Sequence, residues 1–103
     1  MIRWSPAAPA RPSCPHRRLA RLLAAELGEG ATCSSSTLRP WASANFVGAR
    51  HLFACTIRDG SLEALRERLV VIEWKLSGHI VADVAVEPGD GDAVRIEILT
   101  VED

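Results

Sequence analysis

Residues 70–98 read VVIEWKLSGHIVADVAVEPGDGDAVRIEI, and this stretch decides the fold. Apolar and polar residues alternate from Val70 to Val86 and again from Val94 to Ile98. A period of two over such a length is typical of a strand with one buried and one solvated face. The intervening residues 88–92, PGDGD, have the composition of a hairpin loop. The stretch therefore predicts a long strand, a tight loop and a second strand paired with the first.

The charges of this hairpin indicate its register. If Asp83 stood opposite Glu97, two carboxylates would lie side by side, whereas Asp83 opposite Arg95 makes a favourable pair. We therefore expect the register that pairs Asp83 with Arg95. Near the C-terminus the apolar positions shift to Leu99 and Val101, which predicts a bulge or a change of partner there.

Two other segments have helical periodicity. Leucines spaced by three and four residues predict a helix over about residues 15–27, with Ser13 as its N-cap. The same spacing predicts a second helix over about residues 61–70, with Ser61 as its N-cap after the turn at Asp59–Gly60. Each helix has one apolar stripe, so both helices can cover the same face of a sheet.

The remaining segments predict two more strands. Residues 31–38 are rich in Ser and Thr and specify a strand weakly. Trp41 to Ile57 alternates better and predicts one strand with a bend or bulge at Gly48, or two strands joined at Gly48. The order αββαββ predicts an α/β (α+β) two-layer sandwich, with two helices on one face of a mainly antiparallel four-stranded sheet. This is the element order of a circularly permuted ferredoxin-like fold. We expect a single domain over residues 15–103 after a flexible Pro/Ala-rich tail at residues 1–14.

Composition and charge narrow the class of protein. The chain has 103 residues, of which 48% are hydrophobic and 24% charged, as in ordinary globular domains. Residues 1–50 hold seven Arg and two acidic residues, whereas residues 51–103 hold five basic and eleven acidic residues. A basic half can attract nucleic acid or anionic lipid, but it can equally pack on the acidic half of its own chain or of a second copy.

Cysteine usage and hydropathy bear on location. The chain has three cysteines, an odd number, at wide spacing: Cys14, Cys33 and Cys55. This spacing matches neither a metal knuckle nor a dense disulfide framework. We therefore expect reduced thiols and a cytoplasmic protein, with Cys55 packed as a small apolar side chain. No stretch approaches the eighteen apolar residues of a membrane span, so we expect no membrane partner.

Three segments carry a resemblance. The strings WASANFVGARH at residues 41–51, GHIVADV at residues 78–84 and LTVED at residues 99–103 resemble short uncharacterised bacterial proteins with the pattern SAxFxGARH, GHxVADV and LTVED. The resemblance covers about residues 15–103, with Asn45 as a small departure. It implies a bacterial, cytoplasmic, single-domain protein and transfers no mechanism.

Five residues are candidates for binding: Arg50, His51, His79, Asp83 and Arg95. His79 and Asp83 are four residues apart on one strand face, about 13 Å along it, so they need a third group between them. His51 from a neighbouring strand would supply it, giving two imidazoles and a carboxylate, which are groups that hold metals or transfer protons. However, the face that His51 shares with apolar residues points into the helix layer, where an ordinary buried histidine is the competing interpretation.

The remaining expectations concern chemistry and partners. Arg50 can bind a phosphate or a carboxylate ligand, or it can form a structural ion pair with Glu73, Glu87 or Glu97. The chain has no phosphate-binding glycine loop, serine elbow or zinc-protease motif, so we expect no cofactor. Nucleic acid is not favoured as a partner, because the chain has no Tyr and few aromatic residues to stack on bases.

The sequence favours a non-catalytic binding module over an enzyme. We expect it to form a homo-oligomer through the surface or edge of its sheet, and to recognise a protein or a small ligand. The alternative is a small metal-dependent or acid/base enzyme that uses His51, His79 and Asp83.

Overall fold

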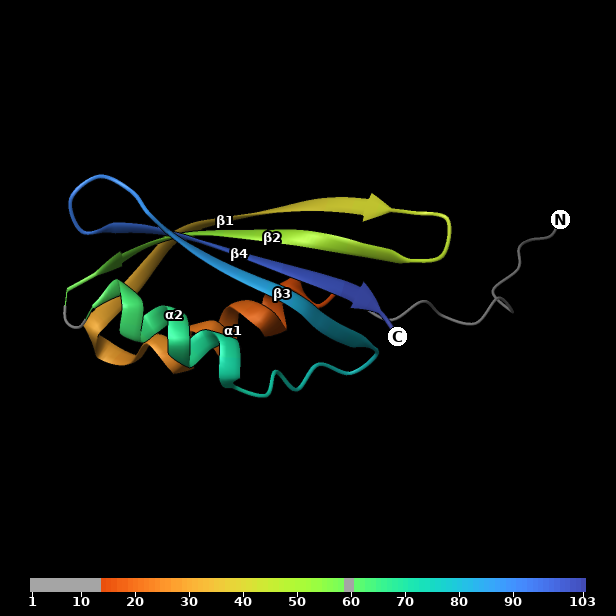
Figure 1. Cartoon of the computed structure of the whole chain (residues 1–103), viewed down its shortest axis with the longest axis horizontal. Helices are drawn as coiled ribbons and strands as arrows, with labels where there is room; N and C mark the ends of the chain where they lie inside the picture. The colour runs from red at the N-terminus through yellow and green to blue at the C-terminus, as the bar shows by residue number, and fades with distance from the viewer. Residues whose placement is uncertain (1–13, 59–60) are drawn as a thin grey trace, which may run out of the picture.

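Two helices cover one face of a four-stranded antiparallel sheet in the computed structural model, which describes residues 14–58 and 61–103 (Figure 1). This confirms the two-layer sandwich and the order αββαββ. The elements in chain order are α1 (His16–Leu27), a 3₁₀ turn (Gly28–Gly30), β1 (Ala31–Ala42), β2 (Val47–Ile57), α2 (Leu62–Val71), β3 (His79–Pro88) and β4 (Ala93–Glu102).

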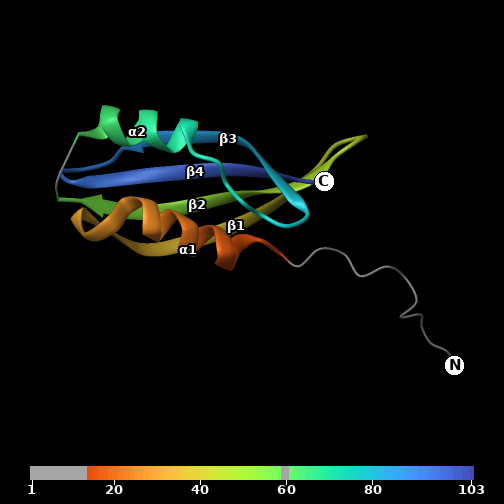
Figure 2. The same ribbon diagram turned by 90° about the horizontal axis from the view of Figure 1, so that it is seen from below.

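The sheet order is β1-β2-β4-β3, so β1 and β3 are the edge strands. Two hairpins, β1–β2 and β3–β4, join through the antiparallel pair β2–β4. This is the order that a ferredoxin-like sheet has when its first strand is moved to the end of the chain. Figure 2 shows the helix side, where α1 lies against the β1 half of the sheet and α2 against the β3 half.

The core lies between the helices and the sheet. Leucines at the predicted spacing are buried on both helices, and they pack on alternate residues of the two central strands. Removing a side chain of this size from water contributes about 1.5–3 kcal/mol. The buried residues are Leu19, Leu23, Leu27, Ala31, Phe53, Cys55, Leu65, Leu69, Val86, Val94, Ile96 and Ile98.

Both predicted helices are confirmed to within one residue at each end. The predicted N-cap of α2 is also confirmed, because the Ser61 hydroxyl accepts a hydrogen bond from the Ala64 amide at 3.0 Å. At α1 the N-cap position is Pro15, which has no side-chain capping bond. Ser13, the tail at residues 1–13 and the turn at residues 59–60 lie outside the described residues.

The predicted continuous strand from Val70 to Val86 is wrong in its first half. Val70 and Val71 complete α2, and residues 72–78 carry the chain back to the sheet without joining a ladder. The alternation that suggested a strand is nevertheless an alternation of burial. The side chains of Ile72, Trp74 and Leu76 pack against the core, while those between them are exposed.

Residues 41–57 belong to two strands, as one of the two predictions had it, but the strands do not join at Gly48. Trp41 belongs to the end of β1, and a turn closed by the Ser43 amide and the Phe46 carbonyl (2.8 Å) leads into β2. Gly48 is therefore not a bend within a strand but the partner of Trp41 in the ladder. A Cβ at Gly48 would lie 2.0 Å from the Thr100 carbonyl oxygen and 2.9 Å from Trp41 Nε1, so no side chain fits there.

The predicted register of the last hairpin is also wrong. Arg95 stands opposite Glu87, and Asp83 stands opposite Leu99. The loop sets this register, because the Gly89 amide donates to the Ala93 carbonyl at 2.8 Å and fixes where the two strands begin to pair. A favourable charge pair is still formed, with Glu87 in place of Asp83.

The predicted irregularity near Leu99 lies instead in the neighbouring strand. The bulge falls at Ala82, between the β3 pairs made by Val81 and Asp83, while β4 keeps a regular alternation to its end. Leu99 and Val101 lie on the face of β4 opposite Ile96 and Ile98, where their neighbours on this central strand leave them half-buried.

Candidate functional site

The sheet face opposite the helices, here called the open face, has none of the described elements over it (Figure 1). Its apolar side chains include Leu52, Leu99 and Val101, which are half-buried. The main open-face residues, taken from the strand registers, are Arg39, Trp41, Gly48, Arg50, Leu52, Ile80, Asp83, Glu87, Arg95, Glu97, Leu99 and Val101.

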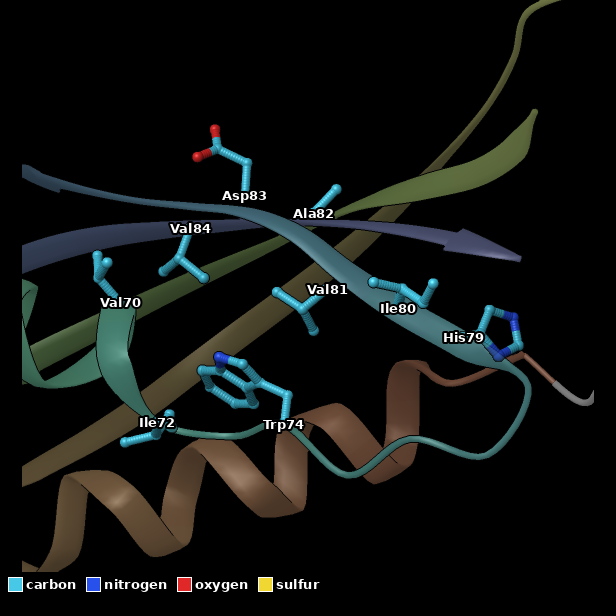
Figure 3. A pocket seen from close by; sticks show the side chains of 9 residues that line it. All are labelled: Val70, Ile72, Trp74, His79, Ile80, Val81, Ala82, Asp83 and Val84. Carbon is cyan, nitrogen blue, oxygen red and sulfur yellow. The ribbon is translucent and has the colours of Figure 1, made fainter. Parts of the chain in front are cut away.

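The structure does not bring the predicted site residues together. The bulge at Ala82 adds one residue to β3, which reverses the alternation on either side of it. His79 consequently lies on the helix side and is 8% exposed, whereas Asp83 is exposed on the open face. Figure 3 shows Asp83 pointing away from the side of β3 that carries Val81 and Val84. The predicted shared face of His79 and Asp83 is therefore wrong.

Arg50 and Arg95 lie on the open face and are held in ion pairs. Arg50 Nη1 contacts Glu97 Oε2 at 2.7 Å, and Arg95 Nη2 contacts Glu87 Oε1 at 2.5 Å. The hydrogen bond that Arg95 donates to the Glu87 carboxylate raises the pKa of Arg95. These contacts confirm the interpretation of Arg50 as one partner of a structural ion pair.

His51 is fully buried in the helix layer, as its strand pattern predicted, and it is part of a chain of hydrogen bonds. Its Nδ1 lies 2.8 Å from Nδ1 of His16, the first residue of α1, and its Nε2 lies 2.8 Å from the hydroxyl of Thr100. His16 Nε2 lies 2.9 Å from the Ser36 hydroxyl. The chain of contacts thus ties the start of α1 to β1, β2 and β4.

One set of tautomers satisfies every member of this chain. The Thr100 hydroxyl donates to the Ala49 carbonyl at 3.5 Å, so it accepts from Nε2–H of His51. Nδ1 of His51 then has no proton and accepts from Nδ1–H of His16. The remaining His16 nitrogen, Nε2, accepts from the Ser36 hydroxyl. This assignment follows from the network of partners.

The surroundings of the pair disfavour the charged imidazole. Burial lowers the pKa of His51 to about 4, with further contributions from the neighbouring His16 and His79. Burial also lowers the pKa of His16. The ring of His16 is nearly parallel to that of Phe53, with ring centroids 5.4 Å apart. At neutral pH both imidazoles are therefore uncharged, and the hydrogen bond between them links the start of α1 to β2.

The geometry of this chain limits its chemistry. A histidine beside a hydroxyl is the arrangement that activates a nucleophile. However, Thr100 is fully buried, so a substrate does not reach its oxygen. Among the residues that the structure describes, no group of three or more His, Cys, Asp or Glu side chains is placed to hold a metal ion.

Sequence analysis missed His16 and Thr100 as partners of His51. Their sequence separations from His51 are 35 and 49 residues, so no local pattern connects them. The one available signal was a polar Thr100 on the buried side of β4, among Ile96 and Ile98.

A cavity of about 360 Å³ opens beside the free edge of β3 (Figure 3). One wall is the segment after α2, with Ile72 and Trp74, and the other is β3 from His79 to Val84. The Trp74 indole N–H donates to the Leu69 carbonyl at 3.3 Å, which leaves its ring as an apolar wall. Such a site suits an apolar side chain or a small ligand.

The expectation of three reduced thiols is wrong for two of them. Cys33 and Cys55 face each other across the β1–β2 ladder and form a disulfide. Cys55 is buried and Cys33 is exposed. Cys14 is a free, exposed thiol at the start of the described chain. Structural disulfides persist in oxidising compartments and are rare in the cytosol.

The comparisons with known proteins identify no relative: no family model, curated protein or solved structure matches this chain. No helix within residues 14–58 and 61–103 has the length and apolar character to span a membrane.

Proposed function

We propose that the protein is a small non-catalytic binding module that self-associates through the open face and recognises a further protein or small ligand. The observation that carries the proposal is the composition of this face. Leu52, Leu99 and Val101 form an apolar strip at its centre, and the ion pairs of Arg50 and Arg95 flank the strip. A sheet face of this kind is stable in water but gains from being covered.

The recognition of a further partner is assigned to the cavity beside β3. It lies at a sheet edge and has Trp74 as an apolar wall, so it can accept a side chain from outside. Val81 and Val84 line it from the helix side of β3, whereas Ile80 and Asp83, which also line it, belong to the open face. Packing of two open faces would therefore leave the helix side of this cavity, with Trp74, uncovered.

The enzyme hypothesis loses the geometry that it required. His51 and His79 lie on the helix side of the sheet, whereas Asp83 lies on the opposite face. The three groups cannot act on one substrate in this fold. A bacterial source and a cytoplasmic location stay predictions of the sequence, and the redox state of the cysteines bears directly on the location.

Sedimentation equilibrium over a wide concentration range tests self-association. We expect the wild-type chain to change from monomer to dimer with concentration, and Leu52→Glu to shift the dissociation constant upward by about tenfold or more, because it buries a charge at the centre of the interface. Ala25→Glu, which adds the same charge on the exposed side of α1, is the matched control and should associate as the wild type does.

A wild-type protein that stays monomeric at the highest concentration would overturn the self-association part of the proposal. Equal weakening by Leu52→Glu and Ala25→Glu would instead show that the copies meet elsewhere. Far-UV circular dichroism of each variant reports whether the sheet is intact.

A further inference from the structure

One row of the open face ends in an unpaired charge at each edge of the sheet. The register places Arg39, Arg50, Leu99 and Asp83 side by side across the four strands. Arg50 is neutralised by Glu97, but neither Arg39 nor Asp83 has an ion-pair partner in the part of the chain that the structure describes. Arg39 also stands directly beside Arg50, which is an unfavourable neighbour.

The charges of the open face balance. Its strand positions hold three basic and three acidic side chains: Arg39, Arg50, Arg95, Asp83, Glu87 and Glu97. A nucleic acid or an anionic membrane requires a surface of one sign. A face that is neutral overall, with opposite charges at its two edges, complements a second copy of itself.

Symmetry leaves two simple ways to stack this face on its copy. If the two-fold axis runs across the strands, β3 lies over β3 of the other copy, so the strand that holds Asp83 and Glu87 faces its own acidic copy and Arg39 on β1 cannot meet Asp83. If the axis runs along the strands, β1 lies over β3 of the other copy and β2 lies over β4. Each row of four side chains then faces the same row of the other copy in the opposite order. Only the second arrangement brings the opposite edge charges, Arg39 and Asp83, together.

We propose that two copies pack their open faces together about a two-fold axis along the strands, with Arg39 of each copy opposite Asp83 of the other. This arrangement rests on the self-association proposed above. Packed sheets cross at about −30°, so the axis lies within about 15° of the strand direction.

The other rows fit the same arrangement. Trp41 meets Ile80 of the second copy, so an aromatic and an aliphatic side chain face each other. Ala54 meets Arg95, and no row places two like charges opposite each other. The apolar contacts and the edge charges therefore favour one register.

The size of the face predicts a weak dimer. Four strands spaced by about 4.8 Å and about ten residues long at about 3.4 Å each give a footprint of roughly 650 Å² per copy. Twice this area, roughly 1,300 Å², lies at the lower end of specific interfaces. Pairing through the sheet edges is less suitable, because Pro40 lies on edge β1 and the Ala82 bulge and Pro88 on edge β3.

Charge reversal followed by mixing tests the pairing directly. In Arg39→Asp alone, and in Asp83→Arg alone, each dimer would contain two like-charge contacts, so we expect each dissociation constant to rise by about tenfold or more. In an equimolar mixture of the two variants every contact is again between opposite charges. We expect the mixture to associate within about threefold of the wild type. Arg17→Asp, on the exposed side of α1, is the control and should have no effect.

The outcomes separate this inference from the proposed function. If the wild type dimerises and Leu52→Glu prevents it, but the mixture fails to recover, then the open faces meet in another register and the inference is overturned alone. If the wild type is monomeric throughout, both proposals fail. Contacts within one chain cannot make the two variants associate with each other. Recovered association in the mixture therefore supports the pairing of Arg39 with Asp83, even where a single variant is less stable than the wild type.

Discussion

The Nδ1 atoms of His16 and His51 lie 2.8 Å apart, so one hydrogen bond between two imidazoles joins the start of α1 to a central strand. At this distance one Nδ1 atom donates its proton and the other accepts it, so the two Nδ1 atoms cannot both be protonated. A doubly protonated pair is therefore incompatible with the bond, and the contact makes the fold sensitive to acid.

The free energy of unfolding should decrease as pH falls from about 6.5 to about 4. The pKa of His51 is lowered from 6.5 to about 4 in the folded chain, so within this window the unfolded chain binds a proton that the folded chain does not. The full difference corresponds to about 3 kcal/mol. Denaturant titrations at several pH values measure it, and the slope in this window should shrink in His51→Gln.

Nuclear magnetic resonance of the imidazole protons provides the independent check. His51 should keep its neutral-ring chemical shifts to about pH 4. A midpoint near 6.5 for His51 would contradict the buried hydrogen-bonded pair.

Loss of the Thr100 hydroxyl should destabilise the protein through His51. Thr100→Val keeps the shape of the side chain but leaves His51 Nε2–H without its partner in a fully buried place. We expect a cost of about 1–3 kcal/mol in the free energy of unfolding. Thr56→Val, at an exposed position of the same sheet, is the matched control and should change stability by less than about 0.5 kcal/mol. Equal effects at the two positions would argue against the network.

Sequence reasoning found the elements because leucine spacing and strand alternation report burial directly. It misplaced what depends on tertiary geometry. The alternation of Ile72 and Trp74 reports packing against the core, yet a segment can alternate in burial without a hydrogen-bonded neighbour. A one-residue bulge at Ala82 cannot be read from a strand whose residues are nearly all apolar, and that bulge separated His79 from Asp83.

The same limit applies to long-range pairs. Cys33 and Cys55 gave no local motif, because they meet only once β1 and β2 are paired in register. The ion pair of Arg50 was easier to predict, since any acidic residue on the same solvated face would serve, and Glu97 was among the three expected.

Thiol titration should find one reactive cysteine in the native protein and three after reduction. Cys14 is free and exposed, whereas Cys33 and Cys55 are joined. Their sequence separation of 22 residues corresponds to about 3 kcal/mol of stabilisation through the unfolded chain. Cys33→Ser should lower the free energy of unfolding by this amount under oxidising conditions and by almost nothing under reducing conditions. Cys14→Ser, which leaves the disulfide intact, is the control. Three reactive thiols in protein purified without reductant would contradict the disulfide and would restore the cytoplasmic expectation.

A side chain at Gly48 should be costly because the obstacle is backbone. In Gly48→Ala the new Cβ would lie 2.0 Å from the Thr100 carbonyl oxygen and 2.9 Å from Trp41 Nε1. Strands β2 and β4 must then move apart, and we expect a loss of about 1–3 kcal/mol or more in a urea titration. Removing the indole does not relieve the carbonyl contact, so Gly48→Ala combined with Trp41→Ala should remain destabilised relative to Trp41→Ala alone. If the two stabilities coincide, the contact that excludes a side chain is the indole, and the close approach of β4 to Gly48 is not what requires glycine.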